Sequence, residues 1–292
     1  MLFPRPARVS LGVSTAVLTA MAMAGCAADR AAPAAEPAPV ESAEVSAAPV
    51  ESVESGEMFV VYEDADSAEA VQGRALLTTA NLLEALADDV NDMLLLPVDV
   101  PVTGQQCDEA NAFWSPSEQA MTICYEDAEL SNRIFEAAGD EDPVGSTLGA
   151  ERATFYHELG HAVIDLYDLP FTGREEDVAD QLAAVLLLQP DDDGQVDPEN
   201  IRAAQAYARM FQGYSEQDGG GAENFPFWDV HEYDLARMYN FQCWIYGSDP
   251  EGNAHMVDQE LVPEDRADSC EGEFDRMSRA WYEMLEPHLR DE

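Results

Sequence analysis

The chain has 292 residues, enough for one domain with a sizeable core or for two small domains. It carries 59 acidic against 14 basic residues, every basic residue is arginine, and the formal net charge is −45. Nucleic-acid binding needs a basic patch, and attraction to anionic lipid needs positive charge, so this balance argues against both. The excess of acid is typical of a solvated surface.

The first 26 residues have the pattern of a bacterial export signal. Arg5 and Arg8 form a short positive region, and residues 11–23 form an apolar stretch that is too short to span a bilayer comfortably. The run Met23-Ala24-Gly25-Cys26 resembles a lipobox, which implies that Cys26 becomes the lipidated first residue of the mature protein. An ordinary secretory signal cut near Ala24 is the alternative. Both interpretations predict a domain outside the cytoplasm.

Residues 27–56 consist mainly of Ala, Pro, Glu, Ser and Val and contain no aromatic residue. Such a segment cannot bury enough apolar surface to offset the entropy lost on ordering. We therefore expect a disordered tether between the membrane anchor and a folded domain of residues 57–292.

The folded part is expected to begin with a strand, a helix and a second strand. Residues 58–62 have strand composition, and residues 68–91 carry apolar side chains at helical spacing. Residues 94–102 also have strand composition. Because Pro97 and Pro101 lie within this second strand, we expect it at an edge of a sheet or irregular.

Two short strand patterns, at residues 112–114 and 120–125, flank a Ser-Pro-Ser-Glu turn and predict a hairpin. Four cysteines lie beyond Cys26, and cysteines of an exported protein are expected to pair. Four cysteines allow three connectivities, and free buried thiols are the alternative. The pairs we expect are Cys107–Cys124 and Cys243–Cys270.

The strongest motif lies in a predicted helix that opens at Ser146 and ends before Pro170. It reads His157-Glu158-Leu159-Gly160-His161. Residues four apart share one helix face, with ~6 Å between their Cβ atoms, so the two imidazoles can hold one metal ion. Glu158 can reach a water on that ion. This is the H-E-x-x-H pattern of zinc ligands and a general base. A surface helix with solvated histidines is the alternative.

A second helix, expected over residues 173–188, follows at once. Thr172 and Glu175 fit a capping box at its start. Helix rise counted from a tight turn slightly favours Asp180 as the third metal ligand, whereas the longer side chain favours Glu176. The spacing leaves the choice open. The candidate third ligands are Glu176, Asp177 and Asp180.

Residues 176–180 read Glu-Asp-Val-Ala-Asp, which resembles the E-x-x-A-D pattern that follows H-E-x-x-H in glutamate-type zincins. Those enzymes include membrane-bound prenyl-protein and heat-shock proteases. The resemblance implies that Glu176 is the third zinc ligand and that Asp180 accepts a hydrogen bond from His157. In zincins a strand beside the cleft pairs with extended substrate. Residues 120–125 are the candidate for that strand, and a purely structural strand is the alternative.

Further stretches resemble a largely uncharacterised bacterial family of metallopeptidases. The resemblance covers about residues 58–290, and it supplies no substrate. The stretches that carry it are residues 96–97, 111–113, 157–165, 173–181 and 243–250.

The residues around position 231 are the other stretch of chemical interest. A zinc peptidase needs a donor that stabilises the oxyanion, and His231 and Tyr233 are the candidates because they lie beside aromatic residues and before a predicted helix. A lone histidine is more often structural. Nothing recommends His255 or His288. Other helices are expected over residues 127–138, 197–212, 234–245 and 273–289.

The sequence thus predicts an α+β fold of zincin type, with a small, mainly antiparallel sheet packed on a predominantly helical body. The expected chemistry is hydrolysis of a peptide or protein substrate outside the cytoplasm. Zn²⁺ is the expected cofactor, Glu158 the general base and His231 an oxyanion donor. The competing hypothesis is a lipid-anchored envelope zinc protein that binds a partner without catalysis.

Overall fold

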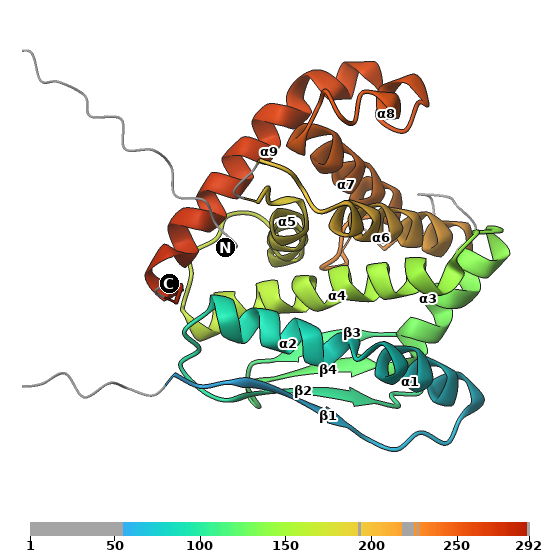
Figure 1. The fold of residues 1–292 in the computed structure, drawn as a ribbon, viewed down its shortest axis with the longest axis vertical. Coiled ribbons are helices and arrows are strands. Elements are labelled where there is room, and N and C mark those ends of the chain that lie inside the picture. Colours follow the sequence, from blue (N-terminus) through green and yellow to red (C-terminus); the bar gives the residue numbers. More distant parts are fainter. Residues whose placement is uncertain (1–54, 192–193, 218–224, 227, 291–292) are drawn as a thin grey trace, which may run out of the picture. The chain divides into compact units, whose positions relative to one another are not determined.

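The computed structural model describes residues 55–191, 194–217, 225–226 and 228–290. Within them the chain forms a small mixed sheet on a mostly helical body, which is the α+β class expected from the sequence (Figure 1). The predicted export signal with Cys26, and almost all of the predicted tether, lie outside the described residues. No helix of the described part is both long and apolar enough to cross a membrane.

The sheet has the strand order β1-β2-β4-β3. Its β1–β2 and β2–β4 pairs are parallel, and only β3–β4 is antiparallel. The prediction of a mainly antiparallel sheet is therefore wrong. Two helices connect β1 to β2, and such a crossover makes neighbouring strands parallel. The strands are β1 (Met58–Tyr62), β2 (Val100–Gln105), β3 (Ala112–Ser115) and β4 (Ala120–Cys124).

Two predicted strands differ from those observed. The proline-containing segment is irregular over residues 94–99, as one of its two alternatives predicted, and β2 begins only at Val100; β2 is an interior strand, so the edge alternative is wrong. Pro101 is tolerated because it pairs only with β1, whereas the pairing with β4 begins at Val102. β4 lies between β2 and β3, so its backbone cannot accept another strand. The edge strand of this hairpin is β3.

The predicted helix over residues 68–91 is two helices, α1 (Ala68–Ala80) and α2 (Leu82–Met93). Asn81 adopts a left-handed conformation with φ of 49°, and its amide donates to carbonyls of the last turn of α1. Asparagine tolerates this conformation better than most residues, which explains the break. α3 (Tyr125–Ala137) follows directly from β4.

α4 (Pro143–Leu166) is the helix around which the other elements are arranged. It begins three residues before the predicted Ser146, because Asp142 accepts a hydrogen bond from the Gly145 amide and Pro143 fits the first helical position. Figure 1 shows α4 between the sheet on one side and the later helices on the other. Most of its side chains are buried, which is why its sequence is apolar nearly all round.

The C-terminal half is helical. The predicted capping box at Thr172 is wrong. α5 begins at Glu175, so Arg174 is its N-cap residue, and no side chain makes a capping hydrogen bond. The last long helix begins at Glu264, earlier than predicted. The helices are α5 (Glu175–Leu188), α6 (Pro198–Gln217), α7 (Asp234–Ser248), the short α8 (His255–Asp258), α9 (Glu264–Leu285) and a 3₁₀ turn, Glu286–His288.

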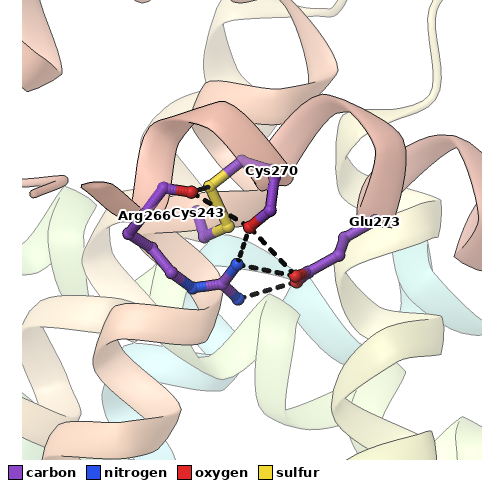
Figure 2. The surroundings of a disulfide bond; sticks show 5 residues. Cys243, Arg266, Cys270 and Glu273 are labelled. Carbon is purple, nitrogen blue, oxygen red and sulfur yellow. Dashed lines mark hydrogen bonds and ion pairs between the residues drawn. A yellow bond between two sulfur atoms is a disulfide. The ribbon is translucent and has the colours of Figure 1, made fainter. Parts of the chain in front are cut away.

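Two disulfides join the predicted partners. Cys107–Cys124 connects the loop before β3 to the end of β4, and Cys243–Cys270 connects α7 to α9. Figure 2 shows the second bond beside Arg266, whose guanidinium donates to both carboxylate oxygens of Glu273 at 2.7 Å. The disulfide therefore links α9 covalently to α7, whereas the bidentate ion pair lies within α9 itself.

Candidate metal centre and active site

α4 and α5 approach each other closely at Gly160. A Cβ on this residue would lie 2.7 Å from the Cα of Ala179, so any side chain there would force the helices apart. The contact brings one face of α4, with His157 and His161, opposite the first turns of α5, with Glu176.

Three side chains converge where the two helices meet. The Nε2 atoms of His157 and His161 lie 3.3 Å apart. Oε2 of Glu176 lies 3.2 Å from Nε2 of His157 and 3.3 Å from Nε2 of His161. Two nitrogens bound to a tetrahedral zinc ion at about 2.0–2.1 Å would be separated by about 3.3 Å. The spacing therefore fits a metal ion, and this is the metal-ligating cluster found among the described residues.

The opposite nitrogens of both rings contact carboxylates. Nδ1 of His157 lies 2.8 Å from Oδ1 of Asp180, and Nδ1 of His161 lies 2.8 Å from Oε1 of Glu175. In each neutral ring Nδ1 therefore donates its proton, and Nε2 presents a lone pair to the cluster. Oε2 of Glu176 is buried and accepts no hydrogen bond. Lone pairs that face one another without a donor are what a cation satisfies.

The carboxylates and imidazoles of the cluster also shift one another's pKa values in the metal-free protein. Burial alone would lower the pKa of His157, but Asp180 outweighs it and raises the pKa to about 9. Burial would likewise raise the pKa of Glu176, yet the neighbouring imidazoles hold it far below the usual carboxyl range. Burial raises the pKa of Glu158, against the opposing effect of the two histidines. A raised pKa suits a carboxylate that accepts a proton.

Arg237 of α7 is a site residue that the sequence analysis missed. Its Nε and Nη2 atoms donate to the two oxygens of Asp180, each at 2.8 Å, and its side chain is 8% exposed. The guanidinium lies 4.0 Å from the ring centre of Phe211. Arg237 and His157 thus hold the same carboxylate. The sequence did contain an indication of this role, because Arg237 is the only arginine between Arg209 and Arg266 in a very acidic chain.

The structure separates the two oxyanion candidates. Nε2 of His231 lies 3.2 Å from Oε2 of Glu176, and Nδ1 lies 3.2 Å from Oδ1 of Asp229. Contact with Glu176 raises the pKa of His231. The hydroxyl of Tyr233 instead lies 3.5 Å from Oγ of Ser215. His231 is therefore beside the cluster.

Two cavities share His157, Glu158 and His231 in their linings. The cleft has a volume of about 540 Å³ and is bordered by β3 and the start of α5. The side cavity has a volume of about 400 Å³ and is bordered by α3 and α6. The indole of Trp114 donates to Oδ2 of Asp165 at 3.1 Å, which fixes the edge strand β3 to α4 beside the cleft.

Fold and site together define an α+β protein with a candidate metal centre between two helices, open to two cavities. A family model named DUF4344, with the description "Putative metallopeptidase", matches residues 62–285. The chain belongs to this family, and membership indicates a metal-dependent protease. Comparison with curated proteins and with solved structures gave no match.

Proposed function

We propose that this protein is a zinc-dependent metallopeptidase that hydrolyses peptide bonds outside the cytoplasm. His157, His161 and Glu176 would hold the ion. The observation that carries the proposal is the pair of Nε2 atoms 3.3 Å apart, each on a ring whose Nδ1 is already bonded to a carboxylate. Imidazole and carboxylate ligands without cysteine fit a catalytic zinc site.

A zinc ion in this position would act as a Lewis acid that makes water and the scissile carbonyl more reactive. Glu158 takes a proton from the attacking water and later gives it to the leaving amine. Asp180 keeps the proton of His157 on Nδ1, and Glu175 does the same for His161. Arg237 holds Asp180 ionised, since its guanidinium lowers the pKa of that buried carboxyl against the effect of burial.

His231 is the proposed oxyanion donor. It lies next to the ligand cluster, lines both cavities, and keeps about half of its side chain exposed to incoming substrate. Replacing it with Ala should lower kcat about 100–1000-fold, because one oxyanion donor is lost. Bound metal should stay stoichiometric. Loss of metal from this variant would instead make His231 a ligand.

The substrate is proposed to lie along β3 in the cleft. β3 pairs with β4 on one side, so its other edge offers main-chain groups to an extended peptide. Residues of β3, Arg174 and Val230 line the same cleft as the two histidines. This assigns to β3 the role that the sequence analysis gave to residues 120–125.

The decisive experiment compares wild type with Glu158→Gln and His157→Ala. Wild type and Glu158→Gln should each bind one zinc ion per chain, whereas His157→Ala should lose most of it. Only wild type should cleave a denatured-protein or peptide library. A wild-type chain that binds no metal on titration contradicts the proposal. A metal-loaded wild type that cleaves nothing favours the partner-binding zinc protein instead.

We also propose that Cys26 anchors the mature protein to the bacterial envelope by a lipid. Support comes from the two disulfides, because such bonds persist in oxidising compartments outside the cytoplasm. Cys26→Ser should move the protein from the detergent-soluble membrane fraction to the soluble fraction. If the wild-type chain is already soluble, the ordinary secretory signal is the better interpretation.

A further inference from the structure

The side cavity contains a buried acidic side chain that the hydrolytic mechanism does not use. Asp127 of α3 lines this cavity and is 6% exposed. Its Oδ1 accepts a hydrogen bond from the hydroxyl of Tyr214 at 3.0 Å. The cavity also reaches Glu158, so Asp127 lies at a place that a substrate side chain next to the scissile bond can reach.

A second buried carboxyl group, Glu151 of α4, interacts with Asp127. Glu151 is 1% exposed, and no donor reaches either of its oxygens. Burial raises the pKa of Glu151 well above the usual range, and the nearby carboxyl of Asp127 raises it further. Burial raises the pKa of Asp127 less, to about 6. Two neighbouring carboxyl groups resist ionising together, and Asp127, the one with the lower pKa, is the one that becomes charged as the pH rises above about 6.

An unpaired hydroxyl lies in the same cavity. Oγ1 of Thr154 is buried without a hydrogen-bond partner, the side chain is 7% exposed, and the residue lines the cavity one helical turn before Glu158. Buried polar groups normally have partners. Thr154 is thus a second, independent sign that a polar group of a ligand enters here.

The rest of the lining suits a long side chain with a charged end. Leu130, Met210 and Phe211 give the cavity apolar walls, and Asp234 adds a second carboxylate. Arg237 also lines the cavity, but both of its bonded nitrogens contact Asp180, so its charge is already compensated. A charge of −45 over the whole chain favours the approach of cationic substrates.

We propose that the side cavity receives the side chain of a lysine or arginine next to the scissile bond, with Asp127 as its counter-ion and Thr154 as a hydrogen-bond partner. The proposal rests on the peptidase function proposed above and adds a preference for basic residues. A lysine or arginine has an apolar stem for the walls and a cationic end for the carboxylate.

The test compares cleavage by the metal-loaded wild type, Asp127→Asn and Asp88→Asn. Asp88 is an exposed acid of α2, so its replacement removes a charge without touching the cavity. Wild type and Asp88→Asn should cleave beside Lys or Arg. In Asp127→Asn, kcat/KM for such peptides should fall about 100-fold, with little change for peptides that carry norleucine at that position. Metal content and melting temperature establish that this variant is folded.

A wild type that cleaves without preferring basic residues, or an Asp127→Asn variant that keeps the preference, overturns the proposal. A wild type that cleaves nothing would overturn the peptidase function, and a binding measurement then decides on the cavity. Acetyl-arginine amide should bind to metal-loaded Glu158→Gln in calorimetry and should bind at least about tenfold more weakly to the Asp127→Asn, Glu158→Gln double variant. Equal binding to both would exclude Asp127 as a counter-ion.

Discussion

At the scale of single residues, the arrangement of the site depends on the carboxylates that contact the Nδ1 atoms of the two histidines. Asp180 is shared between His157 and Arg237, and all three side chains are buried. A carboxylate in this position needs both partners, because an unpaired buried charge is strongly destabilising. Arg237 therefore acts on the metal site only through Asp180 and His157, as a positioning residue.

Removing Arg237 should affect both stability and metal binding. We expect Arg237→Ala to lower the free energy of unfolding by about 3–5 kcal/mol, because Asp180 is left buried and unpaired. Metal affinity should fall about 10–100-fold. Arg237→Lys should rescue part of both losses, since it restores the charge but not the two-pronged contact. Denaturant titration and metal competition measure the two effects.

Arg202→Ala is the matched control for Arg237. Arg202 is exposed, and its pair with Glu199 is an i,i+3 surface contact. Exposed pairs contribute little, so this variant should change the free energy of unfolding by less than about 0.5 kcal/mol. Equal losses in the two arginine variants would show that the Arg237–Asp180 pair has no special role.

The raised pKa of Asp127 makes its contribution to stability depend on pH in the opposite direction to that of a typical paired carboxylate. The pKa of Asp127 is 3.8 for the unfolded reference and about 6 in the folded protein. Between these two pH values the folded state holds a proton that the unfolded state has released. The contribution of this group to stability is therefore present below pH 4 and is lost as the pH rises to 6. Relative to wild type, Asp127→Asn should gain up to about 3 kcal/mol over this range. Urea titrations at pH 4, 5, 6 and 7 test the sign; a constant difference would contradict it.

At the scale of elements, the metal centre requires two helices in close contact rather than one helix with a motif. The absence of a side chain at Gly160 permits this contact with Ala179. The sequence predicted the two helices and their order. Its spacing left the third ligand open between Glu176, Asp177 and Asp180, and the resemblance to glutamate-type zincins implied Glu176. The packing of α5 on α4 turns Glu176 toward both Nε2 atoms and Asp180 toward the Nδ1 atom of one ring.

Gly160→Ala should therefore weaken the metal site although it leaves every ligand in place. The added methyl would lie 2.7 Å from the Cα of Ala179, so α5 must move and carry Glu176 away from the histidines. We expect metal affinity to fall at least about tenfold and stability to fall by about 1–3 kcal/mol. Isothermal titration with zinc gives the affinity.

Gly272→Ala provides the comparison for Gly160. Gly272 lies in α9, where an added Cβ would meet only atoms of the Arg276 side chain, at 3.2 Å or more. Because alanine favours a helix by about 1 kcal/mol over glycine, this variant should be slightly more stable and should bind metal normally. Unchanged metal binding in Gly160→Ala would show that the helix contact does not set the ligand geometry.

At the scale of the whole molecule, the outstanding property is charge. With 59 acidic residues and 14 arginines, most carboxylates have no cationic partner, and the folded chain repels itself. Several arginines are also engaged in specific pairs, such as Arg237 with Asp180 and Arg266 with Glu273. The two disulfides and the buried helical core must hold the fold against this repulsion.

Salt should therefore stabilise this protein. Salt limits the interaction between exposed charges to a Debye length of about 10 Å at 0.1 M ionic strength. It therefore weakens the repulsion between distant carboxylates more than the attraction within the buried ion pairs. We expect the melting temperature to rise steadily between about 10 mM and 500 mM NaCl. The same salts should weaken the approach of a basic peptide to the cleft. A melting temperature that falls with salt would mean that surface pairs outweigh the net charge.

The sequence by itself determined the features that lie within one short segment. His157 and His161 share a face because the α-helical repeat places residues four apart one above the other, and Glu158 follows the first histidine directly. The hairpin of β3 and β4 and the two disulfide pairs were also predicted correctly. Most errors concerned contacts between segments, including the parallel strand pairs, the interior position of β4, and the partner of Glu175.

Only the tertiary structure decided which groups surround that helix face. Arg237, Asp127 and Glu151 come from three helices, and their meeting depends on side-chain packing over long separations in the chain rather than on any local period. Local spacing is set by backbone geometry, which a sequence displays directly. Distant contacts are set by the sum of many small packing energies, which becomes visible only in the folded molecule.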